Sequence, residues 1–146
     1  MLRTLHARIN FAALADFRYE IRRFLNFSEQ AARAAGVEPQ QHQALLAIKG
    51  RPAGFATTVG VLAERLQIRH HSAVELSRRL EARGWIRRSR SGLDRREVQL
   101  HLTSRAEKLL GKLSLAHRDE LREAEPRLVR ALSHAVRRRA RAQVRT

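Results

Sequence analysis

Residues 57–103 decide the fold of this chain, and their sequence is TTVGVLAERLQIRHHSAVELSRRLEARGWIRRSRSGLDRREVQLHLT. Two short amphipathic segments, Val59–Leu66 and His70–Arg83, are separated by a three-residue turn, which predicts two helices in a tight arrangement. A basic segment with a central glycine and alternating apolar residues follows them and predicts a β-hairpin. Helix, turn, helix and hairpin in this order predict a winged helix-turn-helix, a module that places its second helix in a DNA groove.

Before this stretch, the spacing of the apolar residues predicts two further helices. A stripe with three- and four-residue spacing predicts a helix from Asn10 to Ala35, which Gly36 ends. Pro39 suits a first helical turn and predicts a second helix over Gln40–Lys49. A short strand is expected near Phe55, and either Thr57 or Thr58 can cap the helix that follows.

After the hairpin, the sequence predicts two helices separated by a proline. Ser104 and Glu107 have capping-box spacing and predict a helix that runs to about Arg122. Pro126 predicts a break, after which a last helix follows. The expected fold class is therefore mainly α with a small β-hairpin wing (α+β), in a single domain of residues 1–146.

The charge of the chain indicates a polyanionic partner. It carries 30 Lys and Arg against 14 Asp and Glu, for a net charge of +16. Residues 51–103 carry 11 basic and 5 acidic residues, and residues 104–146 carry 12 and 5. A biased composition can explain why only three of the basic residues are Lys, but it does not explain the excess of basic over acidic residues. Nucleic acid is the leading partner class.

Several functions are disfavoured by what the sequence lacks. It contains no cysteine, so disulfides, thiol catalysis and Cys-ligated zinc are excluded. No apolar run approaches the length of a membrane span, and the N-terminus has no continuous apolar signal region, so a cytoplasmic protein is expected. The sequence has no phosphate-binding glycine loop, no nucleophile elbow and no His-Glu-x-x-His motif, so we expect neither an enzyme nor a bound cofactor.

The predicted second helix and hairpin carry the candidate DNA contacts. Residues near the start of such a helix approach base edges, and later basic residues approach phosphates. Val74 suits a thymine methyl group, Arg78 suits guanine and Arg79 suits phosphate. Glu75 either accepts from cytosine or forms a capping box with Ser72. A solvated charged face is the alternative, but the basic hairpin that follows favours DNA. The candidates are Arg69, His70, His71, Ser72, Val74, Glu75, Arg78, Arg79, Arg90, Asp94, Arg95 and Arg96.

Three segments resemble the MarR family of bacterial transcriptional regulators. They are residues 62–68 (LAERLQI), 80–86 (LEARGWI) and 94–103 (DRREVQLHLT). The last is similar to the family's wing signature, an Asp-x-Arg followed by alternating apolar residues and Leu-Thr. The flanking helices also suit the family's layout, so the resemblance covers essentially the whole chain.

The resemblance implies a homodimer in which residues 1–36 and 104–146 are dimerisation helices and residues 37–103 are the DNA-binding lobe. It implies that Arg96 is the wing-tip arginine and that Asp94 orients the wing through an ion pair. Such families often have Ser or Thr at the cap of the recognition helix, where this chain has Arg69. The start of that helix, and the choice among His70, His71 and Ser72 for a base contact, is left open.

An effector site and a metal site were also considered. Five of the seven aromatic residues lie in the first predicted helix, and similar regulators bind small aromatic or phenolic effectors nearby. A pocket using Phe17, Phe24, His42 and Leu46 is one interpretation, and core or dimer packing of these side chains is the other. His117 and Glu120 have helical spacing, but the absence of cysteine and of a second His pair disfavours a regulatory metal.

These features predict a dimeric, sequence-specific transcriptional regulator that binds a near-palindromic DNA operator, with repression released by a small molecule. One alternative is a protein-interaction adaptor or antagonist that has kept the fold and lost DNA binding. Another is a nonspecific nucleic-acid-binding protein, which requires only the charge.

Overall fold

The computed structural model describes residues 9–90 and 96–137 of the chain. The chain forms two compact units. The terminal unit consists of residues 1–28 and 117–146, and the central unit consists of residues 29–116.

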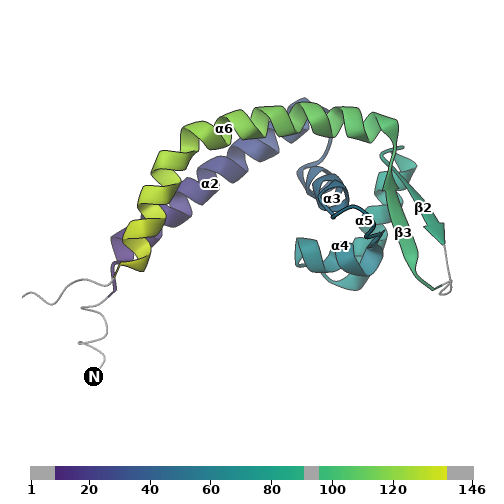
Figure 1. Ribbon diagram of the computed structural model, residues 1–146, viewed down its shortest axis with the longest axis horizontal. Helices are drawn as coiled ribbons and strands as arrows, with labels where there is room; N and C mark the ends of the chain where they lie inside the picture. Colours follow the sequence, from purple (N-terminus) through teal and green to yellow (C-terminus); the bar gives the residue numbers. More distant parts are fainter. Residues whose placement is uncertain (1–8, 91–95, 138–146) are drawn as a thin grey trace, which may run out of the picture. The chain divides into compact units, whose positions relative to one another are not determined.

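The elements are mainly helical, with one small sheet (Figure 1). The sheet is antiparallel in the order β1-β3-β2, so the predicted hairpin gains a third strand. This architecture confirms the predicted fold class, although the first strand lies beyond Phe55. The helices are α2 (Phe11–Ala34), α3 (Pro39–Lys49), α4 (Val59–Leu66), α5 (His70–Ala82) and α6 (Ser104–Val136), and the strands are β1 (Thr57–Thr58), β2 (Ile86–Arg90) and β3 (Val98–Leu102).

Local interactions fix the ends of α4 and α5. The Thr58 hydroxyl accepts a hydrogen bond from the Val61 N–H at 3.2 Å, which confirms Thr58 as the cap of α4. Gln67 is the C-cap residue of α4 and has a left-handed conformation with a φ of 53°, which changes the direction of the chain. Helix α5 then begins at His70. Gly84 has a φ of 73° after α5, a conformation that glycine adopts without steric cost.

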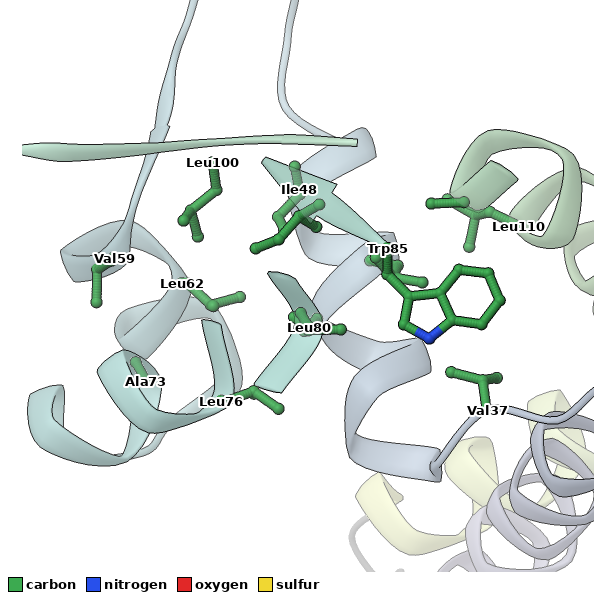
Figure 2. Close-up of a cluster of buried hydrophobic side chains, with 14 of the residues drawn as sticks. Val37, Ile48, Val59, Leu62, Ala73, Leu76, Leu80, Trp85, Leu100 and Leu110 are labelled. Atoms are coloured by element: carbon green, nitrogen blue, oxygen red, sulfur yellow. The ribbon is translucent and has the colours of Figure 1, made fainter. Parts of the chain in front are cut away.

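The core of the central unit packs α5 against α3, α4 and the sheet (Figure 2). Leu62, Leu76 and Leu80 are at most 1% exposed. Trp85 is also buried, and the Arg105 guanidinium lies 4.0 Å from the centre of its ring. Because one side of α5 is buried in this core, the opposite side is held outward. The cluster consists of Ala32, Val37, Ala44, Leu45, Ile48, Val59, Leu62, Ala63, Ala73, Leu76, Leu80, Trp85, Ile86, Leu100, Ala106, Leu110 and Leu113.

The predicted break at Pro126 is wrong, because α6 continues through this residue to Val136. A proline inside a helix removes one backbone hydrogen bond. Next to the proline, side-chain contacts tie α6 to α2 and to its own preceding turn. Arg127 donates to the Glu123 carbonyl and to the Glu20 carboxylate of α2, each at 3.2 Å. Tertiary contacts therefore override the local preference.

The predicted capping box at the start of α6 is also wrong. The Thr103 hydroxyl, rather than that of Ser104, accepts from the Ala106 N–H at 3.3 Å. Glu107 forms an ion pair with Lys49 at 2.7 Å. The Thr103 hydroxyl also donates to the Gly84 carbonyl at 2.8 Å, so this residue joins the start of α6 to the end of α5.

The terminal unit buries only small side chains. Among its described residues, those that are buried are Ala13, Ser28, Ala124 and Ala131. Some of its large apolar residues are half-buried, and the exposed ones are Ile9, Phe11, Leu14, Tyr19, Leu25, Leu121, Val129, Leu132 and Val136. A two-helix unit of this kind leaves an apolar face uncovered. In the described part of the chain, no helix is long and apolar enough to cross a membrane.

Candidate nucleic-acid interface

Helix α5 presents a charged side to solvent. Its inward stripe consists of Ala73, Leu76, Ser77 and Leu80, all of them buried. The remaining positions form the outward side predicted from the sequence. On that side His70, His71, Glu75, Arg78 and Arg79 are exposed, and Ser72 is half-buried. Val74 is half-buried because it packs against the core, so its proposed contact with a thymine methyl group stays a prediction.

The start of α5 is now defined. Arg69 is the N-cap residue, with extended backbone angles and no hydrogen bond from its own side chain to the helix. The helix begins at His70, which places Ser72 inside the first turn. A capping box of Ser72 and Glu75 does not fit this start. The Glu75 carboxylate instead pairs with Arg78 at 2.7 Å, and both side chains are 60% exposed.

The sheet adds basic side chains next to this helix. Arg87 and Arg90 of β2 are exposed, and Arg88 between them is half-buried. Arg96 is exposed just before β3. Two further candidates, Asp94 and Arg95, lie outside the described residues. The central unit thus brings the exposed arginines of α5 and β2 into one compact body.

One contact of this surface was missed by the sequence analysis. Glu81, in the last turn of α5, accepts a hydrogen bond from the Arg88 N–H at 3.0 Å. Its other carboxylate oxygen lies 4.0 Å from the Arg88 guanidinium. Residue spacing does not reveal this contact, because the main partner is a backbone group. The only hint in the sequence is an acidic residue at a helix C-terminus, where the helix dipole disfavours it.

The candidate effector residues fall in different units. Phe17 and Phe24 are half-buried in the terminal unit, whereas His42 and Leu46 lie on α3 of the central unit. His42 is 2% exposed and belongs to the buried set, while Leu46 lines a surface pocket together with Arg65. The structure describes each pair separately, and the proposed pocket stays a prediction.

His117 is part of the packing of the terminal unit. Its Nε2 atom lies 2.8 Å from the Ser28 hydroxyl oxygen. Its ring contacts Phe24 and Phe27 edge to face, with centroids 6.0 and 5.5 Å away. Within residues 9–90 and 96–137, no group of three or more His, Asp or Glu residues is placed to hold a metal ion.

Comparison with known proteins agrees with this geometry. Residues 35–97, which include α3, α4, α5 and β2, match the model of the MarR family. No curated protein sequence matches the chain significantly.

Solved structures share the fold at low sequence identity. AbsC, a MarR family transcriptional regulator from Streptomyces coelicolor, is 18% identical with a TM-score of 0.70, over 86% of this chain and 88% of that one. A mutant of MarR from E. coli complexed with operator DNA is 18% identical with a TM-score of 0.65, over 80% and 85%. A mutant of MepR from S. aureus bound to an oligodeoxyribonucleotide is 19% identical with a TM-score of 0.63, over 86% and 98%.

Proposed function

Through residues 35–97 this chain belongs to the MarR family of transcriptional regulators, and on that premise we propose that it is a dimeric, sequence-specific DNA-binding repressor released by a small molecule. Residues 37–103 form the DNA-binding lobe in this proposal, and residues 1–36 and 104–146 form the dimerisation helices. Two fold relatives bound to DNA, the MarR and MepR mutants, support DNA as the partner.

The outward side of α5 is the observation that carries this proposal. Its inward stripe is packed in the core, so the helix is fixed and its charged side is directed away from the protein. Arg78 can donate two hydrogen bonds to guanine in the major groove, and Arg79 can contact phosphate. His70, His71 and Ser72 lie in the first turn, where such helices approach base edges. Arg90 and Arg96 add basic groups for the neighbouring backbone or minor groove.

The uncovered apolar face of the terminal unit supports a homodimer. A two-helix unit that buries only alanine and serine side chains cannot shield its leucines, valines and aromatic residues from water by itself. A second copy of the same face would cover them by two-fold symmetry. The symmetry would then present two α5 helices to a near-palindromic operator.

Selection of bound duplexes from a random pool, followed by footprinting of the selected sequence, tests this proposal. We expect a near-palindrome whose half-site centres lie about one helical turn apart. Protection without a two-fold pattern would refute the dimeric mode of binding. Equal affinity for selected and random duplexes would favour nonspecific binding, and failure to bind even at low salt would favour an adaptor.

Two arginine variants separate reading of bases from contact with phosphates. Arg78→Ala should reduce discrimination at one base pair by roughly 1–3 kcal/mol, whereas Arg96→Ala should weaken binding to all duplexes. Lys112→Ala, on the exposed side of α6, removes the same charge away from the proposed interface and is the control. Identical affinity profiles for these variants and the wild type would refute the assignment.

The release step requires a ligand that binds the two forms of the protein unequally. The two forms differ in the distance between the DNA-binding lobes of the dimer, and only one of these distances fits the operator. The ligand must bind more tightly to the form that does not fit DNA. We propose Phe17, Phe24, His42 and Leu46 as its contacts. A panel of small phenols and aromatic carboxylates titrated into the operator complex tests this step. If no compound changes operator affinity, this class of effector is refuted while DNA binding stands.

A further inference from the structure

Strand β2 lies at an edge of the three-stranded sheet. The strand order β1-β3-β2 leaves one side of β2 without a neighbouring strand. Arg88 is the middle residue of β2 and lies opposite Leu100 of β3. Its backbone N–H donates to the Glu81 carboxylate at 3.0 Å, so helix α5 supplies the hydrogen-bond partner on this side.

Glu81 occupies a position where a carboxylate is otherwise unfavourable. It precedes the last residue of α5, near the negative end of the helix dipole. A charge-assisted hydrogen bond and the nearby Arg88 guanidinium compensate for this position. The side chains of Arg88 and Glu81 are 21% and 45% exposed, so this contact is somewhat more shielded from solvent than the Glu75–Arg78 pair, in which both side chains are 60% exposed. The shorter interaction of Glu81 is its hydrogen bond with the Arg88 N–H, since the guanidinium lies 4.0 Å away.

The contact adds a link to α5 in the outer half of β2, where Arg88 and Arg90 pair with Leu100 and Val98 of β3. Trp85 and Ile86 anchor the start of β2, with 4% and 1% exposure. Beyond them no residue of β2 is fully buried, because Arg87 and Arg90 are exposed and the two residues between them are half-buried. Glu81 holds the strand at Arg88, two residues before Arg90, and thereby limits its movement away from α5.

We propose that Glu81 is a positioning residue that fixes β2 to α5, so that the arginines of the strand and the helix meet DNA as one preorganised surface. This inference rests on the proposed DNA-binding function. Without the contact, the outer half of the strand is held by β3 alone and can move more freely relative to α5. Fixing its position when DNA binds then has an entropic cost that reduces the benefit of its basic side chains.

A double-variant comparison on the full-length protein tests this role. In the wild type, Arg90→Ala should weaken operator binding roughly 3- to 10-fold at moderate salt, as expected for one lost phosphate contact. In the Glu81→Ala background the same substitution should weaken it less than about 2-fold, because the loosened strand no longer presents Arg90 well. Glu64→Ala, an exposed acidic position on α4, is the matched control and should leave the Arg90 effect unchanged.

A readout without DNA measures the contact itself. The Arg88 amide should exchange slowly with solvent in the wild type and at least about 10-fold faster in Glu81→Ala. Glu81→Gln keeps an oxygen acceptor and should retain part of this protection, and it serves in place of Glu81→Ala if that variant does not fold.

The proposal is overturned if Arg90→Ala has the same effect in both backgrounds, or if it has no effect in the wild type. Unchanged exchange of the Arg88 amide in Glu81→Ala also overturns it. If the wild type does not distinguish operator from random duplexes, the proposed function fails instead, and the exchange measurement still decides whether Glu81 fixes the strand.

Discussion

Replacing Leu132 with serine should weaken dimerisation if the apolar face of the terminal unit is the dimer interface. Leu132 is 46% exposed on α6, between Val129 at 55% and Val136 at 70%. These residues are three and four positions apart and form one stripe on the helix. A face of this kind is covered when a second copy packs on it.

The size of the effect follows from the exposed fraction. Full burial of a leucine side chain contributes about 1.5–3 kcal/mol. Leu132 is 46% exposed, so burying this exposed part in a dimer contributes about 0.7–1.4 kcal/mol per copy. Two-fold symmetry doubles this, which corresponds to a roughly 10- to 100-fold change in the dissociation constant of the dimer.

Sedimentation equilibrium over a range of protein concentrations measures that constant. Phe55→Ser is the matched control, because Phe55 is 64% exposed in a loop of the central unit. It should leave dimerisation unchanged. The reasoning is refuted if Leu132→Ser dimerises as tightly as the wild type, or if Phe55→Ser weakens the dimer equally.

Three further predictions concern the central unit and α6. Thr58→Ala should lower the free energy of unfolding by about 1 kcal/mol, because α4 loses its cap, and an unchanged urea midpoint would contradict this. Gly84→Ala should destabilise the fold by about 1 kcal/mol, because Gly84 has a φ of 73°. Gly111→Ala should stabilise the fold by about 1 kcal/mol, because Gly111 lies inside helix α6. Shifts of the melting temperature in the same direction for both variants would contradict this prediction. Glu75→Gln should leave the free energy of unfolding nearly unchanged, because the pair of Glu75 with Arg78 is exposed. It should raise the affinity for random duplexes, because it removes a negative charge from the DNA-facing side of α5. Equal affinities of the variant and the wild type would exclude a position of Glu75 next to DNA.

The helices of the central unit could be predicted from sequence because their apolar stripes are regular. The predicted bounds Val59–Leu66 are those of α4, and the inward residues Ala73, Leu76, Ser77 and Leu80 of α5 are all buried. A local pattern sufficed here, since each helix contributes one stripe to a single core.

Other features depend on contacts that are distant in sequence. Pro126 predicted a break by local rules, but Arg127 reaches Glu20, a residue 107 positions earlier. The contact of Glu81 could not be predicted from residue spacing, because its hydrogen-bond partner is a backbone N–H on a strand edge. For Phe24 the sequence left packing and an effector contact open, and its edge-to-face contact with His117, a residue far away in the sequence, shows a packing role.

In the proposed function, the apolar face of the terminal unit and helix α5 have different roles. A net charge of +16 gives affinity for any duplex, and such affinity alone would distribute the protein over random DNA. Discrimination requires base contacts such as that proposed for Arg78, each of which contributes roughly 1–3 kcal/mol. A dimer makes every such contact twice, so the discrimination factor of one lobe is squared. If the proposed dimer forms through this face, Leu132→Ser should therefore reduce operator preference more strongly than it reduces affinity for random DNA.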